Sequence, residues 1–315
     1  MEKLAPVIAS KKLDLTSRRR KFKRDYLNLL YMLPVIIGIL GFTLAPMIMA
    51  LIYSFCTMDL LDPQFTLGAP SFQYYSYAFS EGFSEMGKAY LITFRQTILV
   101  SGIGFVGSYI LALILNQKIR GMGAFKIIYY LPCLIPGLAG SLLWTGLTKE
   151  TGLFNQILLS IGLPKYGFYS RNETILPTMI LLSGWGFSGN MIMWLAQFKN
   201  IPNELYEEAN LSGAGRFRKL FKITIPMSTS MIFYLLIMNI IGSLQSFGYY
   251  TQFVDSGKTL DELKFVGILI YETAYTHYNI SYACALSWIL FGVIGILTII
   301  IFTTSKKWVY YAEDN

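Results

Sequence analysis

Residues 282–304 read YACALSWILFGVIGILTIIIFTT and contain no charged side chain. An α-helix rises about 1.5 Å per residue, so a helix of roughly 20 apolar residues crosses a hydrocarbon core of about 30 Å. The sequence therefore predicts an all-α membrane protein with six transmembrane helices. The other five apolar stretches are residues 27–55, 91–115, 127–147, 175–198 and 226–249.

The composition of the whole chain agrees with a membrane protein. Of its 315 residues 54% are hydrophobic and only 14% are charged, and the mean hydropathy is +0.49. These values exclude a soluble enzyme and a disordered chain, because so much apolar surface must be buried, here in lipid. Arg95 is the single charged residue within the six stretches, and it lies near one end of its helix. We expect it to reach the lipid head groups as an interfacial anchor.

Basic residues are distributed unequally between the two sides of the predicted membrane. The arm before residue 27, the segments 116–126 and 199–225, and the tail after residue 304 together hold 19 Lys and Arg, against 6 in the alternate loops. Because positive loops stay in the cytoplasm, the N and C termini are both predicted to be cytoplasmic.

This orientation divides the chain into three parts. Residues 1–26 form a basic cytoplasmic arm that contacts anionic membrane lipid, residues 27–305 the six-span domain, and residues 306–315 a cytoplasmic tail. The arm supplies most of the net charge of +8, so we expect no nucleic-acid partner.

The chain lacks the residue clusters that catalysis or metal binding requires. Its single histidine, His277, falls in a predicted outer loop, and its three cysteines lie in or beside different helices. We therefore expect no catalytic residue, no metal site and no redox site. Residues 257–259, GKT, resemble the end of a phosphate-binding loop, but Gln252 occupies the position where that motif needs glycine. Any ATP is therefore expected to bind to a separate subunit.

The most informative loop is residues 199–226, which we call the elbow. Pro202 opens a short acidic helix, and Gly213 ends it. After this break Phe217 and Phe221 recur with helical spacing among basic residues, so a second, amphipathic helix follows. The residue pattern alone fits a helix on lipid head groups and a helix inserted into a groove on a soluble partner equally well.

Residues 201–226, IPNELYEEANLSGAGRFRKLFKITIP, resemble the signature loop of permease subunits in bacterial carbohydrate ABC importers. That group includes the maltose and glycerol phosphate permeases, and its pattern is approximately IP-x-E-L-x-EAA-x-x-DGA followed by F-x-x-I-T-x-P. Shorter matches at residues 116–132, 143–155 and 270–274 extend the resemblance over most of the six-span region. The chain departs from the pattern at Glu208 and Ser212, and the T-x-GGP segment that the family carries is not evident near Asp255.

The resemblance implies a type I ABC importer permease fold in the bacterial cell membrane. It implies a second homologous permease subunit, cytoplasmic ATP-binding subunits and an extracytoplasmic solute-binding protein as partners. The ATP and Mg would belong to the partner ATPase, and this chain would bind no cofactor. The elbow would be the coupling loop, and its expected contact residues are Glu204, Leu205, Glu207, Glu208, Ala209, Gly213, Ala214, Phe217 and Phe221.

A sugar path through a membrane needs hydroxyl and amide groups for hydrogen bonding and aromatic rings for stacking. The fourth and fifth apolar stretches supply such residues, and the same residues could instead hold the helices together. The alternative substrates are a polyol or a polyol phosphate. The lack of buried basic residues apart from Arg95 disfavours the phosphate, so we expect a neutral sugar or oligosaccharide. The lack of buried carboxylates disfavours the other alternative, a stand-alone secondary transporter or channel. The candidate path residues are Trp185, Asn190, Trp194, Asn239, Ser243, Gln245 and Phe247.

Overall fold

The computed structural model describes residues 31–57, 69–117, 119–247 and 261–310, and every regular element within them is helical. The basic arm, the stretch around Asp255 and residues 257–259 lie outside these ranges. Four helices are long and apolar enough to cross a membrane, and two bent helix pairs bring the number of candidate spans to six. The prediction of an all-α, six-span protein is therefore confirmed.

The four unbroken spans are Tyr31–Phe55, Phe83–Leu115, Asn172–Lys199 and Ile280–Ser305. The first contains a π-helical segment at Leu40–Leu44 and then α2 (Ala45–Phe55). The second consists of α4 (Phe83–Gln96), a π-helical segment at Thr97–Ser101 and α5 (Gly102–Leu115). The third consists of α9 (Asn172–Ser183), a short 3-10 turn and α10 (Phe187–Lys199), and the fourth is α16 (Ile280–Ser305).

The span predicted over residues 127–147 is a bent pair of helical segments and not one continuous helix. The structure has α6 (Met122–Tyr130) and a 3-10 turn at Leu131–Leu134, followed after a bend of 99° by α7 (Gly137–Thr148) and α8 (Leu153–Ser160). The bend falls at Ile135 and Pro136, whose backbones are both extended, with ψ of 120° and 140°. Pro136 has no N–H to continue the helix and disfavours a helical conformation at Ile135.

The fifth span is also bent. The elbow continues into α13 (Ile225–Met227), and α14 (Thr229–Leu244) follows at an angle of 66°. Ser228, at the bend, is completely buried, and its hydroxyl donates to the Thr224 carbonyl at 2.6 Å. The helix ends at Leu244, earlier than the predicted end at residue 249.

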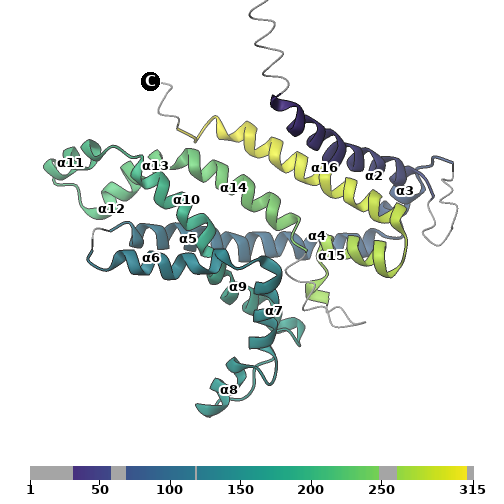
Figure 1. Cartoon of the computed structure of the whole chain (residues 1–315), viewed down its shortest axis with the longest axis horizontal. Helices are drawn as coiled ribbons and strands as arrows, with labels where there is room; N and C mark the ends of the chain where they lie inside the picture. Colours follow the sequence, from purple (N-terminus) through teal and green to yellow (C-terminus); the bar gives the residue numbers. More distant parts are fainter. Residues whose placement is uncertain (1–30, 58–68, 118, 248–260, 311–315) are drawn as a thin grey trace, which may run out of the picture.

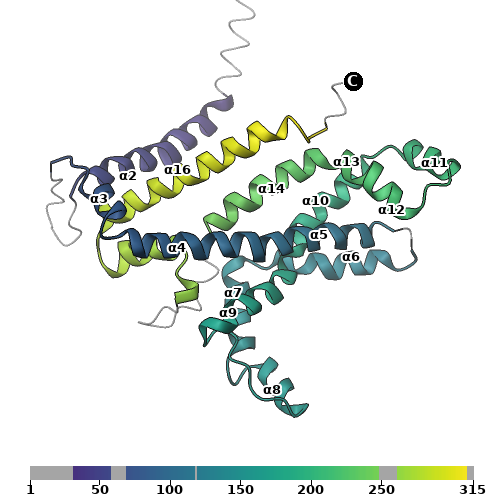
Figure 2. The same cartoon turned by 180° about the vertical axis from the view of Figure 1, so that it is seen from behind.

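The helices pack so that the elbow and the two short helices α3 (Gln73–Phe79) and α15 (Val266–Tyr271) lie at opposite ends of the bundle (Figures 1 and 2). We call these the elbow end and the far end. Both views place the last described residues at the elbow end, and both show α7 and α8 projecting from the bundle.

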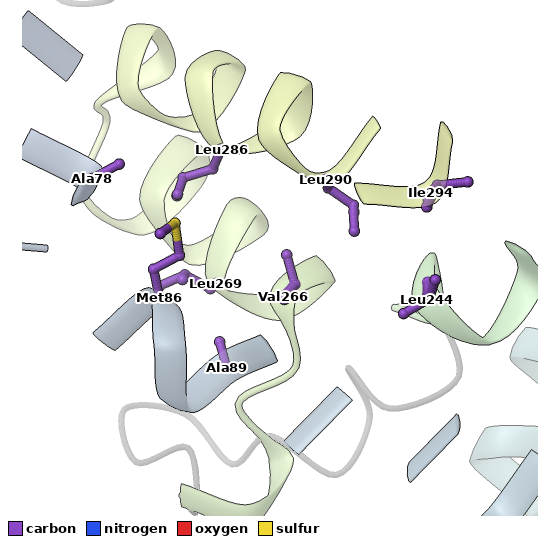
Figure 3. Close-up of a cluster of buried hydrophobic side chains, with 9 residues drawn as sticks. All are labelled: Ala78, Met86, Ala89, Leu244, Val266, Leu269, Leu286, Leu290 and Ile294. Atoms are coloured by element: carbon purple, nitrogen blue, oxygen red, sulfur yellow. The ribbon is translucent and has the colours of Figure 1, made fainter. Parts of the chain in front are cut away.

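Buried side chains fix the two ends separately. At the far end α3, α4, α14, α15 and α16 meet in the cluster shown in Figure 3. At the elbow end a second cluster, which we call the Trp194 cluster, joins α5, α10 and α14. Its fully buried members are Ala112, Leu115, Met191, Trp194, Phe198, Ile201 and Leu235.

Candidate functional site

The elbow folds as two short helices, as predicted. Helix α11 (Asn203–Leu211) begins after Pro202, and α12 (Arg216–Lys219) runs into a π-helical segment at Leu220–Thr224. Glu204 lies in the first turn of α11, where a negative charge is stabilised by the helix dipole. The sequence predicted the start of α11 at Pro202 and its end at Gly213, because proline and glycine each have a direct effect on the backbone conformation.

Gly213 ends α11 in a Schellman motif. Its φ is +70°, its N–H donates to the Asn210 carbonyl at 3.0 Å, and the N–H of Ala214 donates to the Ala209 carbonyl at 2.8 Å. These two bonds satisfy carbonyls that the end of a helix otherwise leaves open. A residue with a Cβ is disfavoured at this φ, so glycine here sets the angle between the two elbow helices.

One face of α11 packs on the bundle. Leu205 and Tyr206 are half-buried against the Trp194 cluster, and the Tyr206 hydroxyl lies 2.9 Å from the Thr224 hydroxyl. Across the turn, the Lys219 ammonium donates to the Asn210 side chain. The elbow is therefore anchored to α10 and α14, the helices that carry most of the candidate path residues.

The opposite face of the elbow is open. Glu207 and Glu208 are exposed, as are Phe217 (79%) and Phe221 (63%). Leu211 is 90% exposed, and it was missed as a site residue. The signal available in the sequence was a leucine at the last position of the helix, after the polar Asn210 and next to the helix-ending Ser212 and Gly213. The exposed surface thus combines carboxylates with large apolar side chains, a composition typical of docking surfaces.

Asn190 and Asn239 lie together between α10 and α14. The Asn190 amide donates to the Asn239 side-chain oxygen at 3.3 Å, and the Asn239 amide donates to the Leu235 carbonyl at 2.8 Å. Asn239 also lines a cavity of about 170 Å³ with Thr97 and Ser101 of the π-helical segment. Both side chains are half-buried and still partly accessible, so the pair can form a hydrogen bond with a further polar group.

Ser243, one helical turn beyond Asn239, is buried in a polar network. Its hydroxyl lies 2.9 Å from the hydroxyls of Thr97 and Ser101 and donates to the Gln96 side-chain oxygen at 3.1 Å. The π-helical turn at Thr97–Ser101 brings both of those hydroxyls to the same serine. With three protein partners, Ser243 acts as a bridge between α14 and the second span.

The two candidate tryptophans have different surroundings. Trp194 is completely buried, its Nε1 donates to the Ser108 hydroxyl at 3.1 Å, and the rings of Phe105 and Tyr109 contact it edge-on. The structure therefore supports the packing interpretation for Trp194, because the ring is completely buried against neighbouring side chains. Trp185 is 36% exposed and lines a cavity of about 180 Å³.

Gln245 and Phe247 open onto a groove at the far end. The groove, of about 430 Å³, lies between the end of α14, α15 and α16, and none of its lining residues is charged. Phe247, Tyr271 and Tyr275 form a row in which neighbouring ring centroids are 4.9 Å apart. The two tyrosines were not predicted as site residues. Tyr271 ends α15 and Tyr275 lies in the π-helical segment Glu272–Thr276, and their local sequence does not indicate a contact with Phe247.

Arg95 has a protein partner where we expected lipid head groups. Its guanidinium forms an ion pair with Glu262, in the 3-10 turn Asp261–Leu263 that precedes α15. Both side chains are partly exposed, at 35% and 26%. The carboxylate neutralises the charge that composition alone would leave inside the second span.

The sequence of this helical chain matches a known family of membrane proteins. Residues 104–312 match the family described as "Binding-protein-dependent transport system inner membrane component". The chain belongs to this family. It is 31% identical to "Probable ABC transporter permease protein YesP" of Bacillus subtilis over 96% of this chain and 98% of that protein. Membership places it in the bacterial cell membrane as a multi-pass transporter permease.

More distant relatives are named for sugars. The chain is 29% identical to the arabinooligosaccharides transport system permease AraP of Bacillus subtilis, over 61% of this chain and 62% of that one. Its fold matches a bacterial ABC transporter that imports the acidic polysaccharide alginate, with a TM-score of 0.79 and 25% identity, covering 91% of this chain and 98% of that one. A second alginate transporter structure, which is a complex with an alginate pentasaccharide-bound periplasmic protein, matches with a TM-score of 0.77 and 26% identity, covering 91% and 96%.

Proposed function

We propose that this chain is the permease subunit of an ATP-driven importer that passes a neutral sugar or oligosaccharide, delivered by an extracytoplasmic binding protein, across the bacterial cell membrane. The observation that carries the proposal is the elbow, whose inner face is anchored to the bundle while its outer face exposes carboxylates and apolar side chains. Both termini and the elbow face the cytoplasm, in line with the excess of basic residues on that side.

The elbow docks on a cytoplasmic ATPase in this proposal. Leu211, Phe217 and Phe221 provide exposed apolar anchors, and Glu207 and Glu208 add charge beside them. An amphipathic helix inserted into a groove uses this combination of apolar anchors and flanking charge. ATP and Mg bind to the partner ATPase, and a second homologous permease completes the membrane domain.

The sugar path runs from the groove at the far end toward the elbow end. The row of Phe247, Tyr271 and Tyr275 offers aromatic faces on which a sugar ring stacks, and Gln245 lies at the same groove. The Asn190–Asn239 pair lies further along α14 and offers amide groups to sugar hydroxyls. The uncharged lining of the groove and the pairing of Arg95 with Glu262 favour a neutral substrate.

Purification of the tagged protein in mild detergent tests the assembly. We expect an ATPase and a second permease to accompany it in stoichiometric amounts, identified by mass spectrometry. A protein that purifies alone and transports without ATP after reconstitution would support a stand-alone transporter or channel instead.

The docking role of the elbow is tested by Glu207→Ala and Phe217→Ala in the reconstituted complex. The matched control is Glu173→Ala, a glutamate in the first turn of α9, away from the elbow. Both elbow variants are expected to lose ATP-driven uptake while inserting normally. Uptake equal to that of the control would refute the docking role.

The substrate class is tested with the binding protein. Lactose, arabinobiose, diacetylchitobiose, an alginate trisaccharide and sn-glycerol-3-phosphate form the panel, and thermal shift of the binding protein followed by uptake of the ligand is the assay. A neutral sugar is the expected ligand; binding of the glycerol phosphate or of the alginate trisaccharide alone would overturn the inference of neutrality.

A further inference from the structure

Beside Ser228, a second hydroxyl side chain with two hydrogen bonds supports the bend between the elbow and α14. Thr229 begins α14 directly after the bend at Ser228. Its hydroxyl donates to the Pro226 carbonyl at 2.7 Å, on the elbow side of the bend. The same oxygen accepts a hydrogen bond from the backbone N–H of Tyr310 at 2.9 Å. Thr229 thus joins three segments at one atom.

The segment that reaches Thr229 comes from the opposite end of the sequence. After α16 ends at Ser305, the N–H groups of Trp308 and Val309 both donate to the Ser305 carbonyl, at 3.1 and 2.9 Å, and turn the chain back. We call residues 306–310 the tail brace. Figures 1 and 2 show that this end of the chain lies beside α13 and the start of α14.

An aromatic contact supports the hydrogen bond. The Trp308 ring packs edge-on against Phe233 of α14, with ring centroids 6.1 Å apart, and Phe233 in turn contacts Phe302 of α16 at 5.0 Å. The tail brace therefore binds α14 at two points, Thr229 and Phe233, one helical turn apart. Edge-to-face aromatic pairs at these distances are favourable.

We infer that the tail brace is a positioning element, which locks the bend at Ser228 so that movement of the elbow is transmitted to α14. The elbow connects to α14 through this bend, and α14 carries Asn239 and Ser243 of the candidate path. A helix break without support absorbs motion by flexing, whereas a break tied to α16 passes it on. The inference rests on the proposed coupling role of the elbow.

Two matched pairs of variants isolate the brace. Thr229→Val removes the hydroxyl and keeps the branched side chain, while Thr229→Ser keeps the hydroxyl. A chain ending at Lys307 loses both contacts of the brace, while a chain ending at Tyr310 retains both. The first pair differs in the two hydrogen bonds of the Thr229 hydroxyl, and the second pair differs in both contacts of the tail brace to α14.

The distribution of distances between two spin labels measures how rigid the bend is in the assembled complex. One label is placed at Arg218 in the elbow and one at Met238 on α14, both exposed, after Cys56, Cys133 and Cys284 are replaced by serine. Distances are measured without nucleotide and after trapping with Mg-ATP and vanadate. A residue needed only for stability would not change these distances in a complex that has assembled.

We expect one narrow distance distribution in both states for the unmodified chain, Thr229→Ser and the chain ending at Tyr310. Thr229→Val and the chain ending at Lys307 are expected to show a second population. Its ratio to the first rises by at least about twofold, because each variant loses at least one neutral hydrogen bond. The sugar imported per ATP hydrolysed is expected to fall by a similar factor.

The inference is overturned if all of these chains share one distribution, or if the unmodified chain already shows both populations in equal amounts. If the chain ending at Lys307 fails to assemble, the comparison of Thr229→Val with Thr229→Ser decides. Failure of the proposed function has a different signature: the unmodified complex would not import any sugar of the panel with ATP, whatever the state of the bend.

Discussion

Gly213→Ala is expected to weaken the elbow through the backbone alone. The φ of Gly213 is +70°, and a Cβ built there meets no atom within 4 Å, so the substitution introduces strain without a clash. A residue with a Cβ in the left-handed region costs roughly 1–2 kcal/mol. This energy corresponds to a change of about 5- to 30-fold in the population of the capped end of α11.

Gly215 provides a matched control two residues away. A Cβ there also meets nothing within 4 Å, but its φ is −68°, which alanine adopts without strain. Gly213→Asn is a second control, because asparagine tolerates the left-handed region better than alanine does. The three variants separate the sign of φ from the effect of an added side chain.

Hydrogen exchange across residues 203–214 in the assembled complex measures the opening of the cap, and ATP-driven uptake measures its consequence. We expect amide exchange to be about 5- to 30-fold faster in Gly213→Ala, with uptake reduced in parallel, and both to stay near normal in the two controls. If exchange and uptake in Gly213→Ala match those of Gly215→Ala, the Schellman motif does not hold the elbow and the reasoning is refuted.

Three further comparisons of variants test the packing of the bundle. Trp194→Ala is expected to lower stability by about 3–5 kcal/mol in detergent unfolding, whereas Trp185→Ala, at a partly exposed ring, lowers it by much less and reduces sugar uptake instead; equal losses of stability would contradict the distinction. Ser243→Ala removes three hydroxyl contacts and is expected to cost about 1–2 kcal/mol, against almost nothing for Ser246→Ala, whose buried hydroxyl has no partner among the residues that the structure describes. Arg95→Ala combined with Glu262→Ala is expected to be milder than the sum of the single changes by about 1 kcal/mol, and an additive double-mutant cycle would show that the pair contributes nothing.

Sequence reasoning succeeded where a local rule acts on neighbouring residues. The six spans follow from runs of apolar residues, and the elbow helices follow from Pro202 and Gly213, each of which restricts its own backbone. The bend at Pro136 also follows from a local rule, because the residue before a proline disfavours the helix, whereas the run of apolar residues alone indicates only a span.

Contacts between distant segments lay beyond such rules. Trp194 and Trp185 are both tryptophans in one apolar stretch, and only the packing of α5 against α10 shows that Trp194 is buried while Trp185 lines a cavity. Arg95 pairs with Glu262, and the ring of Phe247 contacts that of Tyr271. These partners lie far apart in the chain, and a periodic sequence pattern does not predict such contacts.

The amino-acid sequence by itself determined that this chain crosses a membrane, how many times it does so, and which loop forms the elbow, because hydrophobic length and the backbone preferences of proline and glycine are properties of adjacent residues. Only the tertiary structure decided which polar residues bridge helices, which line cavities, and that Tyr310 closes on Thr229 at the bend before α14. Those outcomes depend on how whole helices pack, since a side chain's partners are set by the distances between helices and not by its neighbours in the chain.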